Sequence, residues 1–168
     1  MKSIAIVVMC ILAAIAYGIV HDSITARICV EYFTIGHSRV IASTDPTPLA
    51  VTWAVLATWW IGALLGSIWA FSARFGTRPK FGAKRLVRPL FLVILVTAAG
   101  ACFGGGVGHE LAVNHIVVLQ GELARVVPEE RHVAFLTCLW AHSASYLAAA
   151  ISGLVVAVWT WRARGRSA

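Results

Sequence analysis

Long apolar runs alternate with short polar segments along the whole chain. The runs cover residues 4–20, 49–72, 87–107 and 134–161. A helix rises about 1.5 Å per residue, so runs of about 20 apolar residues match the hydrocarbon thickness of a bilayer. The pattern therefore predicts an all-α, polytopic membrane protein. We expect a four-transmembrane-helix bundle that forms a single domain over residues 1–168.

The positive charges indicate how this bundle is oriented in the membrane. Only 12% of the 168 residues are charged, and the net charge is +7. Most cations lie around the loop 73–86 or after residue 161: Arg74, Arg78, Lys80, Lys84, Arg85, Arg88, Arg162, Arg164 and Arg166. Under the positive-inside rule this predicts that both termini and the basic loop 73–86 are cytoplasmic. Anionic lipid headgroups are the expected partner of these cations, and nucleic acid is not.

The two remaining loops, 21–48 and 108–133, carry most of the titratable groups. All seven acidic residues lie there: Asp22, Glu31, Asp45, Glu110, Glu122, Glu129 and Glu130. Five of the six histidines lie there too: His21, His37, His109, His115 and His132. In a bacterial inner (plasma) membrane, which the sequence style suggests, these loops would face the periplasmic or extracellular side.

The stretch HDSITARICVEYFTIGH, residues 21–37, follows the first apolar run directly. Its composition predicts that the first helix continues past the membrane. In such a helix Arg27 and Glu31 would be neighbours one turn apart and would form an ion pair. Tyr32 and Phe33 would serve as anchors at the membrane surface.

Histidines and acids from three runs are candidates for a metal site. The first run ends in His21 and Asp22, the third in His109 and Glu110, and the fourth contains His142. Ionisable residues inside a membrane span are costly and are functional candidates. Imidazole and carboxylate together suit zinc, iron, copper or manganese, so we expect these five residues to bind a metal ion or another small ligand. The alternative is solvated loop charge, with a neutral His142 hydrogen-bonded to a neighbouring helix.

Two other functions stay open at this stage. One is a non-catalytic accessory or assembly subunit of a membrane complex. The other is a membrane enzyme in which a histidine acts as general base on a lipid-like substrate. The sequence has no HExxH motif and no GxSxG motif, so neither of these two catalytic motifs supports the enzyme alternative.

Small and aromatic residues in the spans suggest how the helices pack. Gly62 and Gly66 form a GxxxG pair, and glycine recurs every fourth residue over 100–108. Such faces allow close helix contact, within the chain, in a homo-oligomer or with a membrane-protein partner. Trp53 and Trp69 lie near the two ends of the second run, where interfacial anchors are expected.

Two further features leave alternatives open. The cysteines Cys10, Cys29, Cys102 and Cys138 include no CxxC pair, and the sequence does not select a disulfide among the last three. Residues 1–16, which end in Ala-Ile-Ala, also match a cleavable signal peptide. We expect that the first segment is retained as a span.

Overall fold

The computed structural model describes residues 1–166, and its regular structure over that range is helical. The four long helices are α1 (Lys2–Ile28), α3 (Pro46–Arg74), α4 (Ala83–Val113) and α6 (His132–Gly165). Three short helices complete the described part: α2 (Glu31–Thr34), α5 (Gly121–Val126) and the 3-10 helix η1 (Glu129–Arg131). Four of the described helices are long and apolar enough to cross a membrane, which confirms the prediction of an all-helical, multi-pass fold.

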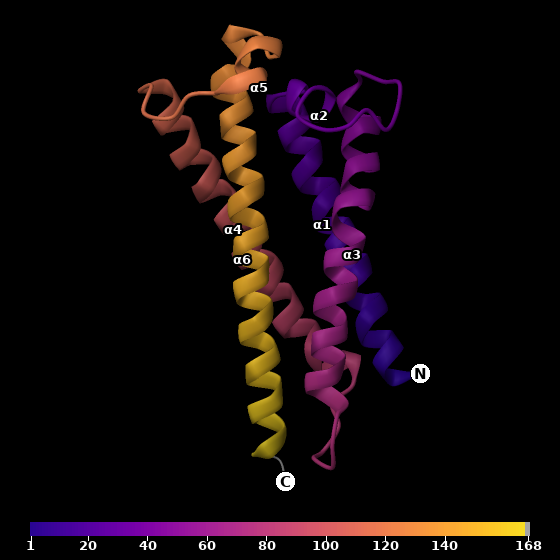
Figure 1. Cartoon of the computed structure of the whole chain (residues 1–168). Helices are drawn as coiled ribbons and strands as arrows, with labels where there is room; N and C mark the ends of the chain where they lie inside the picture. The colour runs from indigo at the N-terminus through magenta and orange to yellow at the C-terminus, as the bar shows by residue number, and fades with distance from the viewer. Residues whose placement is uncertain (167–168) are drawn as a thin grey trace.

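The long helices form two antiparallel pairs, α1 with α3 and α4 with α6 (Figure 1). Both termini lie at the same end of the molecule as the α3–α4 loop. We call this the basic end, because it carries the arginines and lysines of residues 74–88 and 162–166. The opposite end, which holds α2, α5 and η1, is called the acidic end.

Glycine allows close contact within each pair. A Cβ on Gly62 of α3 would lie 2.7 Å from the backbone oxygen of Cys10 in α1. A Cβ on Gly104 of α4 would lie 2.9 Å from the backbone oxygen of Trp140 and would collide with Ala144, both in α6. The predicted glycine faces therefore pack against helices of the same chain, and contact with another protein stays a prediction.

The sequence predicted that the first helix would continue past the membrane and include Glu31. The structure shows that it ends earlier. It ends at Ile28, where Cys29 takes up an extended conformation (φ −150°, ψ 98°), and α2 begins at Glu31. The chain changes direction at this break, which turns Tyr32 and Phe33 inward. They are only 7% and 2% exposed, so the prediction that they anchor the membrane surface is wrong.

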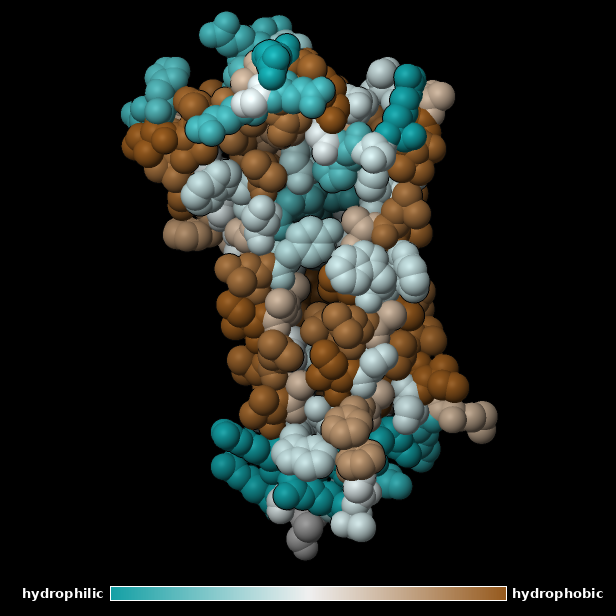
Figure 2. All heavy atoms as spheres, viewed as in Figure 1, coloured by the Kyte–Doolittle hydropathy of each residue, from teal (hydrophilic) through white to brown (hydrophobic). Residues whose placement is uncertain are grey.

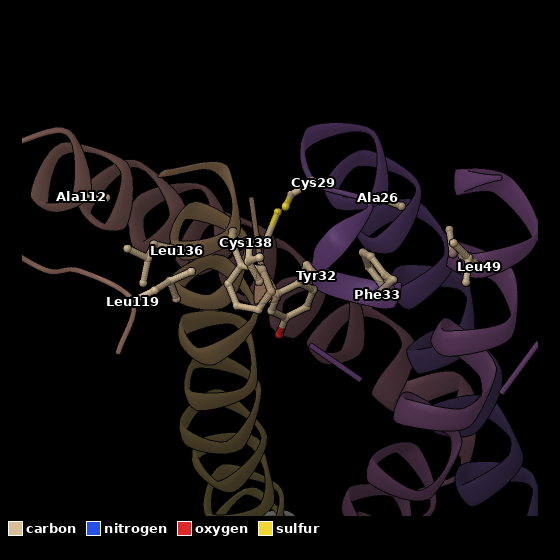
Figure 3. Packing of buried hydrophobic residues seen from close by; sticks show 12 residues of the cluster. Ala26, Cys29, Tyr32, Phe33, Leu49, Ala112, Leu119, Leu136 and Cys138 are labelled. Atoms are coloured by element: carbon tan, nitrogen blue, oxygen red, sulfur yellow. The ribbon is translucent and has the colours of Figure 1, made fainter. Parts of the chain in front are cut away.

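A buried cluster at the acidic end joins α1, α2, α3, α4 and α6 (Figure 3). Cys29 and Cys138 belong to this cluster and point toward one another in the figure. All four cysteines lie within the described residues and are free thiols. Burial raises the pKa of the Cys29 thiol, which keeps it protonated and unreactive at neutral pH.

Two buried side chains, Trp69 and Arg164, join the two helix pairs at positions nearer the basic end. The Trp69 indole donates to the backbone oxygen of Gly153 at 2.8 Å, and its side chain is 1% exposed. Trp69 is therefore not an interfacial anchor, because its N–H finds a partner inside the bundle. The fully buried Arg164 guanidinium donates to four carbonyl oxygens at the end of α3 and in the following loop: Ser72, Phe75, Arg78 and Pro79.

An apolar belt separates two hydrophilic ends on the face that Figure 2 shows. This distribution is what a bilayer requires, because the hydrocarbon region accepts apolar side chains and the aqueous interfaces accept charge. Trp59 and Trp60 are half exposed on α3, in agreement with a lipid-facing position.

Candidate metal centre

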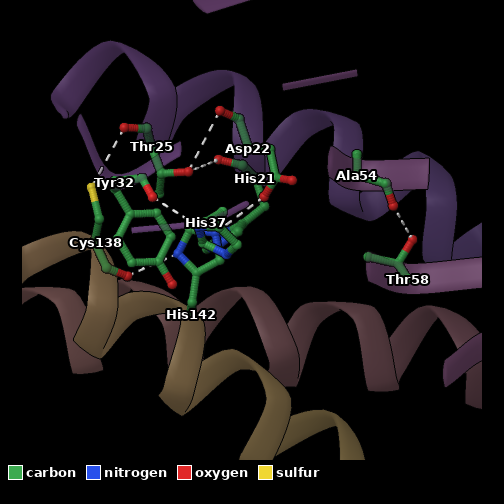
Figure 4. A network of polar contacts seen from close by, with 9 residues as sticks. All are labelled: His21, Asp22, Thr25, Tyr32, His37, Ala54, Thr58, Cys138 and His142. Atoms are coloured by element: carbon green, nitrogen blue, oxygen red, sulfur yellow. Dashed lines mark hydrogen bonds and ion pairs between the residues drawn. The ribbon is translucent and has the colours of Figure 1, made fainter. Parts of the chain in front are cut away.

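Two adjacent α1 residues and one α6 residue meet inside the bundle near the acidic end (Figure 4). The ligand atoms of His21, Asp22 and His142 all lie within 4.8 Å of one another. The side chains of Asp22 and His142 are 7% and 11% exposed. His142 is ten residues into α6, about 15 Å along the helix from its start, so the group lies well inside the apolar part of the structure.

The two ring nitrogens of His142 have different neighbours. Nδ1 lies 2.8 Å from the backbone oxygen of Cys138, and a carbonyl can only accept, so Nδ1 carries the proton. Nε2 lies 3.2 Å from Oδ1 of Asp22. A nitrogen lone pair and a carboxylate oxygen repel each other at this distance unless a cation lies between them. The pair therefore holds either a proton or a metal ion.

His21 contributes a nitrogen that has no protein partner. Its Nε2 is buried and accepts or donates no hydrogen bond among residues 1–166. The ring lies edge-on to His142, with centroids 4.4 Å apart, and stacks on Tyr17 at 5.7 Å. Leaving a buried polar atom unpaired costs about 1–3 kcal/mol, so this nitrogen beside Asp22 and His142 is available to a further partner, as is the unpaired hydroxyl of Tyr17.

The segment after α1 covers this group. The Tyr32 ring lies 4.6 Å from the His142 ring, and Phe33 lies 5.9 Å from it. Nδ1 of His37 is 2.7 Å from the backbone oxygen of Tyr32, and the His37 ring contacts Trp53 of α3 at 4.6 Å. The polar stretch that follows the first apolar run thus folds into an aromatic cover over the buried histidines.

Glu31 forms an ion pair with Arg131 rather than with Arg27. Its Oε2 lies 2.9 Å from Nε of Arg131, whose Nη2 also donates to the backbone oxygen of Ile28 at 2.8 Å. Arg27 instead donates to the backbone oxygen of Ser23 at 2.7 Å. The predicted Arg27–Glu31 pair is wrong because the helix that would align them ends at Ile28.

The Glu31 carboxyl is shifted toward its charged form. Partial burial acts to raise its pKa, but hydrogen bonds from the backbone, Arg131 and Cys29 outweigh that effect. The pKa of Glu31 therefore lies below its ordinary value of 4.5. The ion pair that joins α2 to η1 is consequently formed at neutral pH.

A cavity of about 90 Å³ extends from His21, Asp22 and His142 toward the basic end, where it reaches Trp69 of α3. All four long helices line it. Most of the remaining lining residues are apolar or small, and Thr58 and Thr97 are among the polar ones. In Figure 2 the surface is hollowed between the two helix pairs near the acidic end, and hydrophilic side chains lie in the recess.

His109 and Glu110 lie outside this group, although the sequence suggested them as ligands. Both are exposed at the end of α4, and Nδ1 of His109 lies 3.3 Å from the hydroxyl of Thr137. The glycine face of α4 packs on α6, where Gly108 contacts Trp140. His109 therefore meets α6 at Thr137, five residues and more than one helical turn before His142, which keeps it outside the group. The structure thus brings together three of the five predicted residues.

Sequence reasoning missed Tyr17 and Tyr32, which contact the two histidines. Tyr17 precedes His21 by four residues, so the two share one face of α1. That spacing could have identified Tyr17. No comparable signal identified Tyr32, because its contact with His142 depends on the chain reversal after Ile28.

Two imidazole nitrogens and one carboxylate oxygen form a donor set that zinc and non-haem iron sites share. Ligands of a tetrahedral zinc ion lie about 3.3 Å apart when each bond is about 2.0–2.1 Å long. The 3.2 Å between His142 and Asp22 is close to this spacing and is also that of a hydrogen bond, whereas the three ligand atoms together lie within 4.8 Å. Both ring nitrogens of His142 already have a neighbour, Cys138 O or Asp22 Oδ1. Neither is therefore free to accept a proton from the hydroxyl of Ser145, as a general base would.

No protein-family model, curated protein or solved structure matches this chain significantly.

Proposed function

We propose that this protein binds a divalent transition-metal ion, of zinc, iron, copper or manganese, inside its membrane-spanning bundle. His21, Asp22 and His142 are the ligands. The observation that carries the proposal is the convergence of three ligand atoms within 4.8 Å, one of which is a buried nitrogen with no other partner among the described residues. The hydrogen bond from Nδ1 of His142 to a backbone oxygen supports it, since metal-binding histidines orient their second nitrogen in this way.

The size of the cavity restricts what the site holds. A volume of about 90 Å³ equals that of about three waters, at about 30 Å³ each, so it accommodates an ion with one or two waters but not haem. Three protein ligands would leave a fourth position of a tetrahedral ion open to water or substrate. An open position of this kind distinguishes reactive zinc sites from closed structural ones.

Metal content of the purified protein tests this proposal. We expect about one equivalent of a transition metal by mass spectrometry in the wild type, and loss of it in Asp22→Asn and His142→Ala. The double variant His109→Ala/Glu110→Ala is the matched control and should retain the metal, because those side chains lie outside the group. Asp22→Asn keeps the size and a hydrogen-bonding oxygen, so metal loss without a change in helical content separates ligation from folding.

Two results would overturn the proposal. The first is a wild type that contains no metal and takes up none of the four ions during dialysis. The second is equal metal loss in the control and in Asp22→Asn, which would indicate a wider or different site.

We also propose that the basic end faces the cytoplasm of a bacterium and that the protein resides in the inner (plasma) membrane. The supporting observation is that ten of the fourteen lysines and arginines lie at the basic end, and four lie at the acidic end. A fluorescent protein fused after residue 166 should fold and fluoresce. Alkaline phosphatase inserted into the loop 114–120 should be active, and the reverse pattern would contradict this orientation.

A further inference from the structure

A groove between α4 and α6 lies at the basic end, far from the metal centre. It has a volume of about 690 Å³, within the range of sites that bind small organic ligands. Three arginines line it: Arg85 near the start of α4, and Arg162 and Arg166 near the end of α6. None of the proposed metal ligands His21, Asp22 and His142 lines this groove.

These arginines have no acidic residue nearby in the sequence. Residues 46–109 and 131–168 contain no aspartate or glutamate. Arg85 packs over the Phe81 ring at 3.7 Å, which holds its stem beside the start of α4. Guanidinium groups bind phosphate oxygens in a bidentate manner, so three of them around one groove favour a phosphate ligand.

The remaining wall of the groove is apolar. Leu154, Val155 and Val158 of α6 line it and are 52%, 61% and 52% exposed. Trp159, which also lines the groove, lies between these side chains and Arg162. Aromatic residues of this kind occur at the level of the lipid headgroups. The groove therefore changes from apolar to cationic within about two helical turns.

We propose that this groove binds one anionic phospholipid. Its phosphate contacts Arg85, Arg162 and Arg166, and its acyl chains lie along Leu154, Val155 and Val158. A soluble phosphate would use the arginines but would leave the apolar wall uncovered. A neutral phospholipid would cover the wall but would carry no net negative charge toward three cations. An anionic phospholipid satisfies both parts of the groove.

Binding of phosphatidylglycerol to the full-length protein in detergent tests the proposal, measured by native mass spectrometry. The variant is Arg85→Gln/Arg162→Gln/Arg166→Gln. The control, Lys2→Gln/Lys80→Gln/Lys84→Gln, removes the same charge at the same end, but none of its residues lines the groove. Neither variant changes the buried Arg164. We expect binding to be at least about tenfold weaker in the groove variant than in the control, since the loss of a single charge-assisted hydrogen bond costs about tenfold or more.

Three outcomes would overturn this assignment. Equal weakening in both variants would indicate a diffuse surface charge rather than a site. Equal binding of phosphatidylcholine and phosphatidylglycerol would exclude recognition of the anion. Displacement of the lipid by millimolar inorganic phosphate would identify a soluble anion as the ligand. Melting temperatures within a few degrees of the wild type are required of both variants before binding is compared.

Discussion

Asp22 and His142 illustrate how a membrane-spanning bundle accommodates single ionisable residues. Each would be costly alone in the apolar interior, but together they lie 3.2 Å apart and have nearly no exposed surface. The arrangement requires a cation between them, either a proton or a metal ion. His142 was recognisable from the sequence because it interrupts an apolar run. Asp22 was also a candidate, but the sequence did not choose between it and Glu110 as the partner of His142, because 120 residues separate Asp22 from His142.

Removing one member of this pair should destabilise the protein more than removing both. His142→Leu leaves the Asp22 carboxylate buried without a cation, and we expect it to lower the free energy of unfolding by about 3–5 kcal/mol. Asp22→Leu/His142→Leu should recover much of that loss. Unfolding by denaturant in metal-free micelles measures both changes. Losses that simply add would contradict direct coupling between the two side chains.

The helix pairs are held together by backbone contact at glycines. In α4, Gly100, Gly104 and Gly108 lie on one face and meet Ala148, Ala144 and Trp140 of α6 in turn. The four-residue spacing predicted that a close contact would form, because it repeats once per turn. It did not predict which helix would supply the other side.

Replacing Gly104 should therefore weaken the α4–α6 pair. A Cβ there meets Ala144 and the backbone oxygen of Trp140, and backbone cannot move aside easily. We expect Gly104→Ala to lower stability by about 1–3 kcal/mol. Gly106→Ala is the matched control, because a Cβ at that position meets nothing within 4 Å. Thermal unfolding compares them, and equal melting temperatures would contradict the packing argument.

At the scale of the whole molecule, polar contacts join two tightly packed pairs that have a cavity between them. These contacts are Asp22–His142 and Glu31–Arg131 toward the acidic end, and the Trp69–Gly153 and Arg164 hydrogen bonds toward the basic end.

Because the lowered pKa of Glu31 reports stabilisation of its charged form, the strength of the Glu31–Arg131 ion pair should depend on pH.

The sign of that dependence follows from the direction of the shift. A carboxyl whose pKa is lower in the folded state stabilises the fold above its unfolded pKa. The stabilisation is lost as the pH falls from the ordinary value of 4.5 through the lowered folded value. Melting temperatures measured across this range should fall less steeply for Glu31→Gln than for the wild type. Glu122→Gln, at an exposed position, should behave like the wild type, and identical slopes for all three would contradict the link.

The sequence by itself determined the helices and their membrane character. Apolar runs of bilayer length have few alternatives to helix, because every backbone group in hydrocarbon must be hydrogen-bonded within its own segment. It also determined the separation of charge between the two ends and the presence of an ionisable residue inside the last span. These properties depend on local composition and spacing, which are visible in a single chain.

Only the tertiary structure decided which side chains meet. The chain reversal after Ile28 buried Tyr32 and Phe33, and it paired Glu31 with Arg131 instead of Arg27. Packing of α4 on α6 placed His109 beside Thr137 and left Glu110 exposed, so neither joins His21, Asp22 and His142. The physical reason is that helix spacing fixes neighbours within one helix. Neighbours on different helices depend instead on the break between α1 and α2 and on which faces pack together.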